Sequence, residues 1–139
     1  MFEIDLAKQV LYLVEDHKVS AVVPVSSGNG GTFTNYSGRR VRAVTPEGTF
    51  SFYKQRNYNH VSYLGAMYKP YYFRGGYAIH GSPSVPAGPA SHGCIRVTNS
   101  DMDFLREHLE IGMSIIVYGQ RTENPTGIIY PALLGATAA

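Results

Sequence analysis

Turn residues divide this chain of 139 residues into short apolar segments, and only one segment has the period of a helix. Glycine occurs 15 times and proline 8 times, and charged residues make up 16% of the chain, against about a quarter in an average protein. Hydrophobic residues make up 44%, which suffices for one hydrophobic core, and the length is too short for two ordinary domains. The sequence therefore predicts a single, turn-rich β domain.

The predicted strands are short runs of apolar or alternating residues bounded by turn signals. They cover residues 2–6, 10–14, 19–25, 49–54, 68–73, 76–80 and 114–118. The first three are expected to form an antiparallel meander. Residues 26–34, with three glycines, and residues 81–93, rich in Pro, Gly, Ser and Ala, are expected to be irregular.

One helix is predicted, with Asn99 or Ser100 as its N-cap and acidic residues in its first turn. Its apolar face is formed by three residues at helical spacing, Met102, Leu105 and Leu109. Gly112 is expected to end the helix. The helix should cover one side of the sheet.

Charge and hydropathy exclude several kinds of partner and segment. The net charge is +2, and the Lys and Arg residues are scattered except at Arg39, Arg40 and Arg42, which is too weak a basic field to predict nucleic-acid binding. No run approaches the roughly 18 apolar residues of a membrane-spanning helix. The N-terminus lacks the basic start and apolar core of a secretion signal. If the protein works outside the membrane, we expect its targeting segment to have been removed or to lie on a part of the gene that this sequence does not include. A single cysteine leaves the redox compartment undecided.

The one cysteine of the chain, Cys94, lies in the run Ser-His-Gly-Cys-Ile-Arg at residues 91–96, fourteen positions after His80. A thiol with its ordinary pKa of about 8.5 is mostly protonated at neutral pH, so a nucleophilic cysteine needs a base nearby. We predict that His80, at the end of a strand, is that base. Its other ring nitrogen is expected to hydrogen-bond a backbone carbonyl, that of Gly81 being the nearest.

The residues around the cysteine suggest supporting roles. The backbone N–H groups of His92, Gly93 and Cys94 are predicted to form an oxyanion hole, and the glycine allows a substrate to approach the backbone. Arg96 is predicted to bind a substrate carboxylate, and Ser91 to steady the loop. For His92, a direct catalytic role and a structural role both remain open.

Other polar and aromatic residues are interpreted more simply. Five tyrosines are assigned mainly to strand packing, with one or two lining a cleft: Tyr63, Tyr68, Tyr71, Tyr72 and Tyr77. Of these, Tyr77 is the one assigned to substrate binding. The remaining histidines, His17, His60 and His108, are interpreted as surface or packing residues. The glycine-rich residues 27–31 lack the Gly-Lys-Ser/Thr ending of a phosphate loop.

Ile79-His80-Gly81 and residues 91–96 together resemble the signature of the L,D-transpeptidase catalytic domain, the YkuD domain. Residues 4–12, 24–28 and 45–50 are similar to that family's other landmarks, in the same order. The resemblance implies a mainly β fold, a sandwich or open barrel of mixed sheet with one principal α-helix after the catalytic loop. It covers roughly residues 2–118 and implies a catalytic domain at residues 2–119. The tail lies outside the resemblance, and its prolines and small residues predict a C-terminal extension at residues 120–139 that wraps the domain or is partly disordered.

The resemblance also implies an enzyme of peptidoglycan. Cys94 would attack the third residue of a tetrapeptide stem, release D-alanine and form a thioester, which an amine of a neighbouring stem would resolve into a 3-3 crosslink. His80 would move the protons, and residues 91–93 and Arg96 would support the reaction. The resemblance implies that the enzyme needs neither a metal nor an organic cofactor. It also implies an extracytoplasmic location, peptidoglycan stem peptides as partners and acylation of Cys94 by carbapenems. We expect a monomer.

Three alternatives remain open from the sequence. An L,D-carboxypeptidase would form the same thioester and pass it to water. A metal-binding module would use His80, His92 and Cys94 as zinc ligands, although a fourth ligand is not apparent. A wall-binding domain without catalysis would keep the fold alone, which the presence of both nucleophile and base disfavours.

Overall fold

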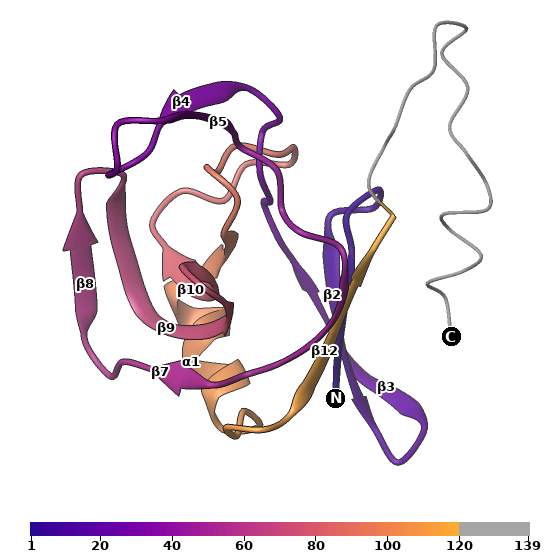
Figure 1. Ribbon diagram of the computed structural model, residues 1–139. Helices are drawn as coiled ribbons and strands as arrows, with labels where there is room; N and C mark the ends of the chain where they lie inside the picture. The colour runs from indigo at the N-terminus through magenta and orange to yellow at the C-terminus, as the bar shows by residue number, and fades with distance from the viewer. Residues whose placement is uncertain (120–139) are drawn as a thin grey trace, which may run out of the picture.

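The computed structural model describes residues 1–119, and the first of its two larger sheets combines strands from both ends of that range with one strand from its middle (Figure 1). Its strands are β1 (Phe2–Asp5), β2 (Val10–Glu15), β3 (Lys18–Pro24), β6 (Gly48–Ser51) and β12 (Ser114–Tyr118). Their order is β3-β2-β1-β12-β6. The β1–β12 pair is parallel and the other pairs are antiparallel.

The second sheet contains the central part of the chain. Its strands are β7 (Lys54–Gln55), β8 (Asn59–Ser62), β9 (Gly65–Arg74), β10 (Tyr77–Ser82) and β11 (Ile95–Thr98). The order is β11-β10-β9-β7, and β8 also pairs with β9. Because β10 and β11 are parallel, residues 83–94 must lead the chain back to the start of the sheet before β11 begins. This returning segment carries Cys94.

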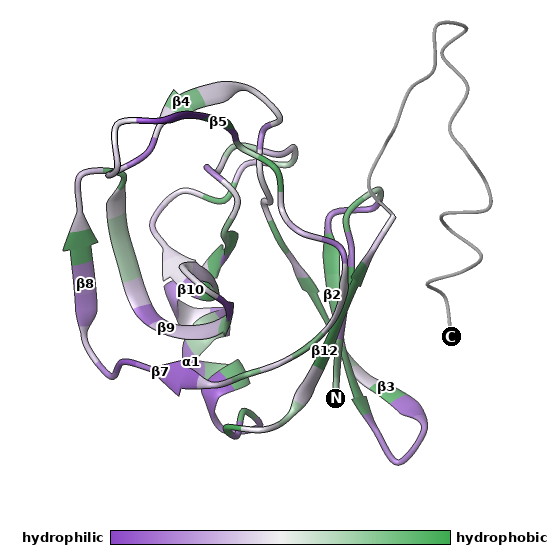
Figure 2. Cartoon of the chain, in the orientation of Figure 1, coloured by the Kyte–Doolittle hydropathy of each residue, from purple (hydrophilic) through white to green (hydrophobic). Residues whose placement is uncertain are grey.

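One apolar core joins the two sheets and the helix (Figure 2). Side chains alternate along each strand, so that in β1 Phe2 and Ile4 point into the core while Glu3 points outward. The least exposed large side chains of the core are Phe2, Ile4, Leu11, Leu13, Phe52, Ile79, Ile95, Met102, Leu105 and Ile115. Each fully buried side chain of this size stabilises the fold by about 1.5–3 kcal/mol. The predicted mixed-sheet β fold is confirmed.

The helix α1 (Asn99–Arg106) packs against β9, β10 and β11. Its N-cap is Thr98, not Asn99 or Ser100 as predicted, because the Thr98 hydroxyl accepts the Asp101 N–H at 3.0 Å. The predicted apolar face is buried. The helix ends at Arg106, before the predicted stop at Gly112. Leu109 therefore belongs to the segment after the helix, and its side chain is buried there.

Two other expectations need correction. Residues 26–34 are not wholly irregular, because β4 (Thr32–Thr34) pairs with β5 (Arg40–Arg42) in a separate hairpin. Strand β10 continues two residues past His80, so the irregular segment starts at residue 83 and not at 81.

The predicted C-terminal extension, residues 120–139, lies outside the described residues, and the division of the chain at residue 119 stays a prediction. Within residues 1–119 the longest helix has eight residues, and no helix there could cross a bilayer.

Candidate active site

Two neighbouring parallel strands bring the cysteine and the histidine to one face of the second sheet. His80 on β10 is paired with Arg96 on β11, and Ile79 is paired with Ile95. Directly paired residues point to the same side, and side chains alternate along each strand. Ile79 and Ile95 therefore enter the core, whereas His80, Arg96 and Cys94 share the opposite face. Diagonal neighbours on one face lie roughly 7–8 Å apart at their backbones, within reach of longer side chains.

His80 is held in one orientation by a backbone bond. Its ring is buried, with 5% of the residue exposed, and Nδ1 lies 2.7 Å from the carbonyl oxygen of Gly81. Because a carbonyl only accepts, the ring proton is assigned to Nδ1 and Nε2 is left as an acceptor. The predicted Gly81 contact is confirmed. Burial lowers the pKa of His80, the Gly81 bond raises it, and the nearby charge of Arg96 lowers it. The ring is therefore neutral at neutral pH.

Cys94 is half-buried at the end of the returning segment. Burial raises the pKa of its thiol to about 11, although a hydrogen bond from the Ala78 backbone and the charge of Arg96 act in the lowering direction. The sulfur donates to the carbonyl of Gly76 at 3.6 Å. At neutral pH the thiol and the His80 ring are therefore both uncharged, and the cysteine depends on a base for activation.

A single hydroxyl orders the residues before the sulfur. The Ser91 Oγ donates to the carbonyl of Cys94 at 2.5 Å and accepts the N–H of Gly93 at 3.0 Å. The predicted oxyanion role is therefore wrong for the Gly93 N–H, which already has an acceptor. The N–H groups of His92 and Cys94 have no acceptor within residues 1–119.

Gly93 is a glycine for two structural reasons. Its φ is +132°, a conformation that L side chains rarely adopt, and a Cβ at this position would lie 2.5 Å from Cε1 of Tyr77. Tyr77 is partly buried and packs against the core. Its ring thus forms a wall against the backbone of the site.

Thr45 supports the same turn and was missed by the sequence reasoning. Its hydroxyl donates to the Gly93 carbonyl at 2.8 Å and accepts the Gly28 N–H at 3.0 Å, and only 2% of the residue is exposed. The signal was present, because Thr45 begins the Thr-Pro-Glu-Gly sequence. That sequence was noted as part of the family landmark at residues 45–50, with no role assigned to the threonine.

The segment before β4 is hydrogen-bonded to the end of the returning segment and to the start of β11. Ser26 exchanges two backbone hydrogen bonds with Arg96, at 3.0 and 2.9 Å. The Ser27 carbonyl accepts the N–H groups of Ala90 and Ser91, at 3.0 and 2.9 Å. The backbone is thereby bonded on both sides of Cys94, at residues 90 and 91 before it and at Arg96 after it.

His92 faces away from this network toward the β4–β5 hairpin. Its ring meets Phe33 edge-on, with centroids 4.9 Å apart and planes at 66°. The hairpin is also bonded to the β8–β9 turn, where the Tyr63 hydroxyl donates to the Thr34 carbonyl at 3.1 Å. For His92, a catalytic role and a structural role were both left open above. Its contact with Phe33 supports the structural role.

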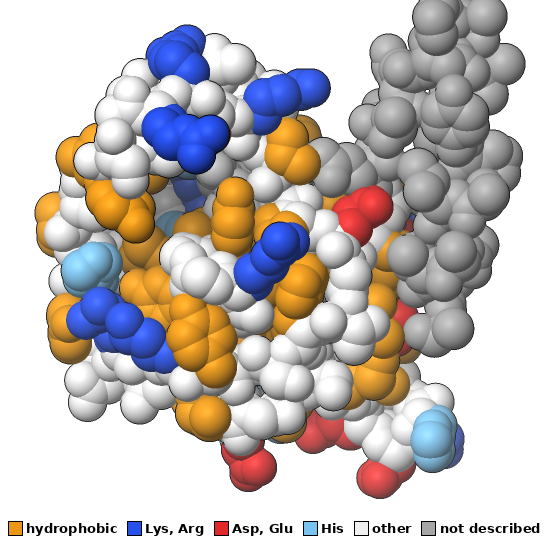
Figure 3. All heavy atoms as spheres, viewed as in Figure 1, with side chains coloured by type: hydrophobic (Ala, Val, Ile, Leu, Met, Phe, Trp, Pro, Cys, Tyr) orange, Lys and Arg blue, Asp and Glu red, His pale blue; other side chains and the backbone are white. Residues whose placement is uncertain are grey.

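Arg96 leaves its charge available. No hydrogen bond or ion pair joins its guanidinium to another residue in the described range, and its field lowers the pKa values of both His80 and Cys94. The space-filling view also shows basic side chains over the β4–β5 hairpin (Figure 3). An unpaired guanidinium beside the thiol is suited to an anionic group.

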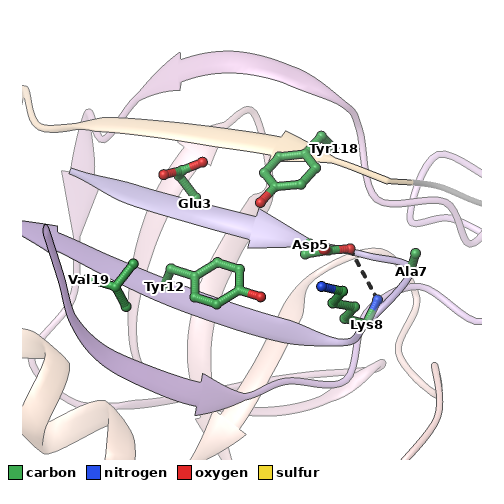
Figure 4. Close-up of a pocket in the computed structure, with 7 residues that line it drawn as sticks. All are labelled: Glu3, Asp5, Ala7, Lys8, Tyr12, Val19 and Tyr118. Atoms are coloured by element: carbon green, nitrogen blue, oxygen red, sulfur yellow. Dashed lines mark hydrogen bonds between the residues drawn. The ribbon is translucent and has the colours of Figure 1, made fainter. Parts of the chain in front are cut away.

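Two surface hollows lie away from the thiol. One, of about 460 Å³, is on the outer face of the first sheet between Glu3, Tyr12 and Tyr118 (Figure 4). Another, of about 450 Å³, reaches Gly28 and Thr45 behind the catalytic segment. Neither is lined by Cys94 or His80.

Among residues 1–119 no three His, Cys, Asp or Glu side chains are gathered as a metal site requires. His80, His92 and Cys94 therefore do not form the zinc set considered above. The ring of His92 instead contacts Phe33.

The chain matches the family model of the L,D-transpeptidase catalytic domain, YkuD, over residues 1–117. It is 50% identical to the crystal structure of an L,D-transpeptidase from Xylanimonas cellulosilytica, with a TM-score of 0.80, and the match covers 84% of this chain and 59% of that one. An L,D-transpeptidase from Stackebrandtia nassauensis is 26% identical with a TM-score of 0.72, covering 88% and 57%. A comparison with curated protein sequences found no match.

The solved catalytic domain of an Enterococcus faecium L,D-transpeptidase gives the extent of the fold. It is 23% identical with a TM-score of 0.63, and the match covers 84% of this chain and 95% of that domain. This chain thus spans nearly all of a solved catalytic domain but under two thirds of the two longer relatives.

Proposed function

Because this chain belongs to the L,D-transpeptidase catalytic-domain (YkuD) family of enzymes, we propose that it crosslinks peptidoglycan stem peptides through a thioester on Cys94. One observation carries the proposal: strand pairing sets His80 beside the strand that Cys94 directly precedes, and the bond of His80 Nδ1 to the Gly81 carbonyl leaves Nε2 free to accept a proton. A general base of this kind accelerates proton transfer by roughly 10²- to 10⁴-fold.

The first half-reaction forms the thioester. Nε2 of His80 takes the thiol proton as the sulfur attacks the carbonyl carbon of the third stem residue, at the L centre of meso-diaminopimelate. The resulting oxyanion is bound by the N–H groups of His92 and Cys94, which have no other acceptor among the described residues. When the intermediate collapses, the D-alanine amine leaves with the proton held by His80, and the acyl group stays on sulfur.

The second half-reaction transfers the acyl group. A side-chain amine of a neighbouring stem attacks the thioester carbonyl and gives a proton to His80. The sulfur then leaves and takes that proton back, which restores the neutral pair and gives a 3-3 crosslink. With water in place of the amine, the same steps give the L,D-carboxypeptidase product.

Arg96 and Tyr77 are assigned to substrate binding. The guanidinium of Arg96 has no partner in the described residues, so it can pair with a carboxylate of the stem. Tyr77 lies against Gly93 and provides an apolar wall beside the reacting carbonyl. The substrate class places the activity outside the cytoplasmic membrane, and neither a metal nor an organic cofactor takes part in these steps.

The proposal is tested by intact-mass measurement after incubation with a carbapenem, comparing the protein with its Cys94→Ala variant. We expect one adduct on the protein and none on the variant. Incubation with purified disaccharide-tetrapeptides should then give dimers that have lost D-alanine. Tripeptide monomers alone would assign the carboxypeptidase reaction, and turnover by the Cys94→Ala variant at the original rate would overturn the role of the thiol.

A further inference from the structure

We infer that Thr45 is a positioning residue that sets the direction of the Cys94 N–H toward the oxyanion. The inference rests on the proposed acyl transfer at Cys94. Thr45 does not touch the sulfur or the imidazole in the bonds described, and acts through the backbone of Gly93. Its role is therefore separate from those of the nucleophile and the base.

The argument follows from the planarity of the peptide bond. The carbonyl of Gly93 and the N–H of Cys94 belong to the same peptide unit, so they lie in one plane and point in opposite directions. The Thr45 hydroxyl holds that carbonyl at 2.8 Å. A hydrogen bond on the carbonyl thus fixes the direction in which the Cys94 N–H points.

The neighbouring peptide units are fixed by a different side chain. Ser91 Oγ accepts the N–H of Gly93, which orients the unit before, and donates to the carbonyl of Cys94, which orients the unit after. The unit between them contains the Cys94 N–H, and its bonded group is the carbonyl held by Thr45. Glycine at position 93 would otherwise let this unit rotate, because glycine has the widest backbone freedom.

The hydroxyl of Thr45 is itself oriented. It accepts the N–H of Gly28 at 3.0 Å, so its own proton is directed to the Gly93 carbonyl. A Cβ on Gly28 would lie 2.3 Å from the carbonyl oxygen of Ala43, so the close approach of this backbone requires glycine. The result is a chain of donors running from Gly28 through Thr45 and the Gly93–Cys94 peptide to the oxyanion. Hydrogen bonds in such chains polarise one another.

Two variants that differ by one hydroxyl give the test. Thr45→Ser keeps the hydroxyl and Thr45→Ala removes it, and both lack the threonine methyl, so packing losses cancel in the comparison. We expect carbapenem acylation of Cys94 to be roughly 10- to 100-fold slower in Thr45→Ala than in Thr45→Ser, which is less than the 10²- to 10³-fold loss of an entire oxyanion donor. Thr45→Val, which keeps the shape, should follow Thr45→Ala. With stem peptide the loss should fall on kcat and leave KM unchanged.

Alkylation of Cys94 by iodoacetamide distinguishes a positioning role of Thr45 from a merely structural one. Attack on its saturated carbon needs the thiolate but develops no oxyanion. We expect the three variants and the original protein to be alkylated within about twofold of one another, while only the variants without the hydroxyl lose acylation.

The outcomes separate the inference from the function on which it rests. Equal acylation of Thr45→Ala and Thr45→Ser would overturn the positioning role while leaving Cys94 as nucleophile. Equal losses of acylation and alkylation would also overturn it, because they would indicate a displaced thiol. If the unaltered protein showed no acylation at Cys94, the proposed function would fail first and the inference with it.

Discussion

The catalytic turn at residues 91–94 and the β4–β5 hairpin that lies beside it are held in different ways. The turn is fixed by bonds from buried side chains, Ser91 and Thr45. The hairpin has only half-buried and exposed residues in its two strands. The Phe33 ring of the hairpin contacts His92 of the turn, and the Thr34 carbonyl accepts a hydrogen bond from Tyr63 in the β8–β9 turn.

This difference suggests that the turn governs the reaction steps and that the hairpin governs substrate binding. Losing one member of a buried hydrogen-bond network costs free energy, so these bonds favour a single geometry of the turn. Exposed contacts of the kind that hold the hairpin are each worth about 1 kcal/mol. We therefore expect the turn to fix the positions of the reacting groups and the hairpin to be the more easily displaced of the two. Substitutions in the two regions should therefore change different kinetic constants.

The largest effect is expected from Gly93→Ala. The new methyl would meet the ring of Tyr77, and the φ of +132° would add strain of about 1–3 kcal/mol. Because a displacement of about 1 Å at a reacting group can cost 10²-fold, we expect carbapenem acylation to be about 10²-fold slower. Single-turnover mass spectrometry would measure it.

The hairpin offers a matched control for that substitution. Gly38 also has a positive φ, of +81°, but a Cβ there would meet nothing within 4 Å. Gly38→Ala should cost about 1 kcal/mol in unfolding free energy and leave acylation within about twofold. Equal losses of acylation in both variants would remove the distinction between the two regions.

A smaller effect is expected when the hairpin contact is weakened. Phe33→Leu keeps an apolar side chain but removes the edge-on ring contact with His92, worth about 0.5–1.5 kcal/mol. We expect KM for a stem peptide to rise by up to about 10-fold with kcat unchanged. Tyr36→Leu is the control, because Tyr36 lies in the same hairpin and is 91% exposed. A fall in kcat for Phe33→Leu would place the hairpin within the chemistry.

The sequence predicted the β4–β5 hairpin less well than the catalytic turn and the longer strands. Strand β12 was predicted with its observed bounds, and His80 and Cys94 could be found because reactive residue types are rare and lie beside glycine. The hairpin was missed because each strand has three residues. The alternation in Thr-Phe-Thr and Arg-Val-Arg, either side of Asn35 and Gly38, was the available signal.

The supporting bonds could not be predicted for a different reason. Thr45 is 48 residues from Gly93 in the sequence, and no local pattern specifies which carbonyl a distant hydroxyl will meet. Likewise, Ser91 Oγ accepts the hydrogen bond of the Gly93 N–H, which the sequence motif alone had assigned to the oxyanion. Local sequence thus identifies reacting groups, whereas tertiary packing decides which backbone groups remain free to help them.

The smallest effect concerns the free energy of unfolding, and it follows from the burial of His80. In the unfolded chain the imidazole takes up a proton near pH 6.5, whereas burial lowers the pKa of His80 in the folded protein. Between these two values the unfolded chain binds more protons, so stability is fully present above about pH 6.5 and is lost as the pH falls toward the folded pKa. His80→Gln should lose less unfolding free energy between about pH 7.5 and about pH 5, measured by urea denaturation. His17→Gln, at an exposed turn, is the control that should keep the original loss. An unaltered loss in His80→Gln would show that other groups take up the protons and that burial does not hold this imidazole neutral in the folded protein.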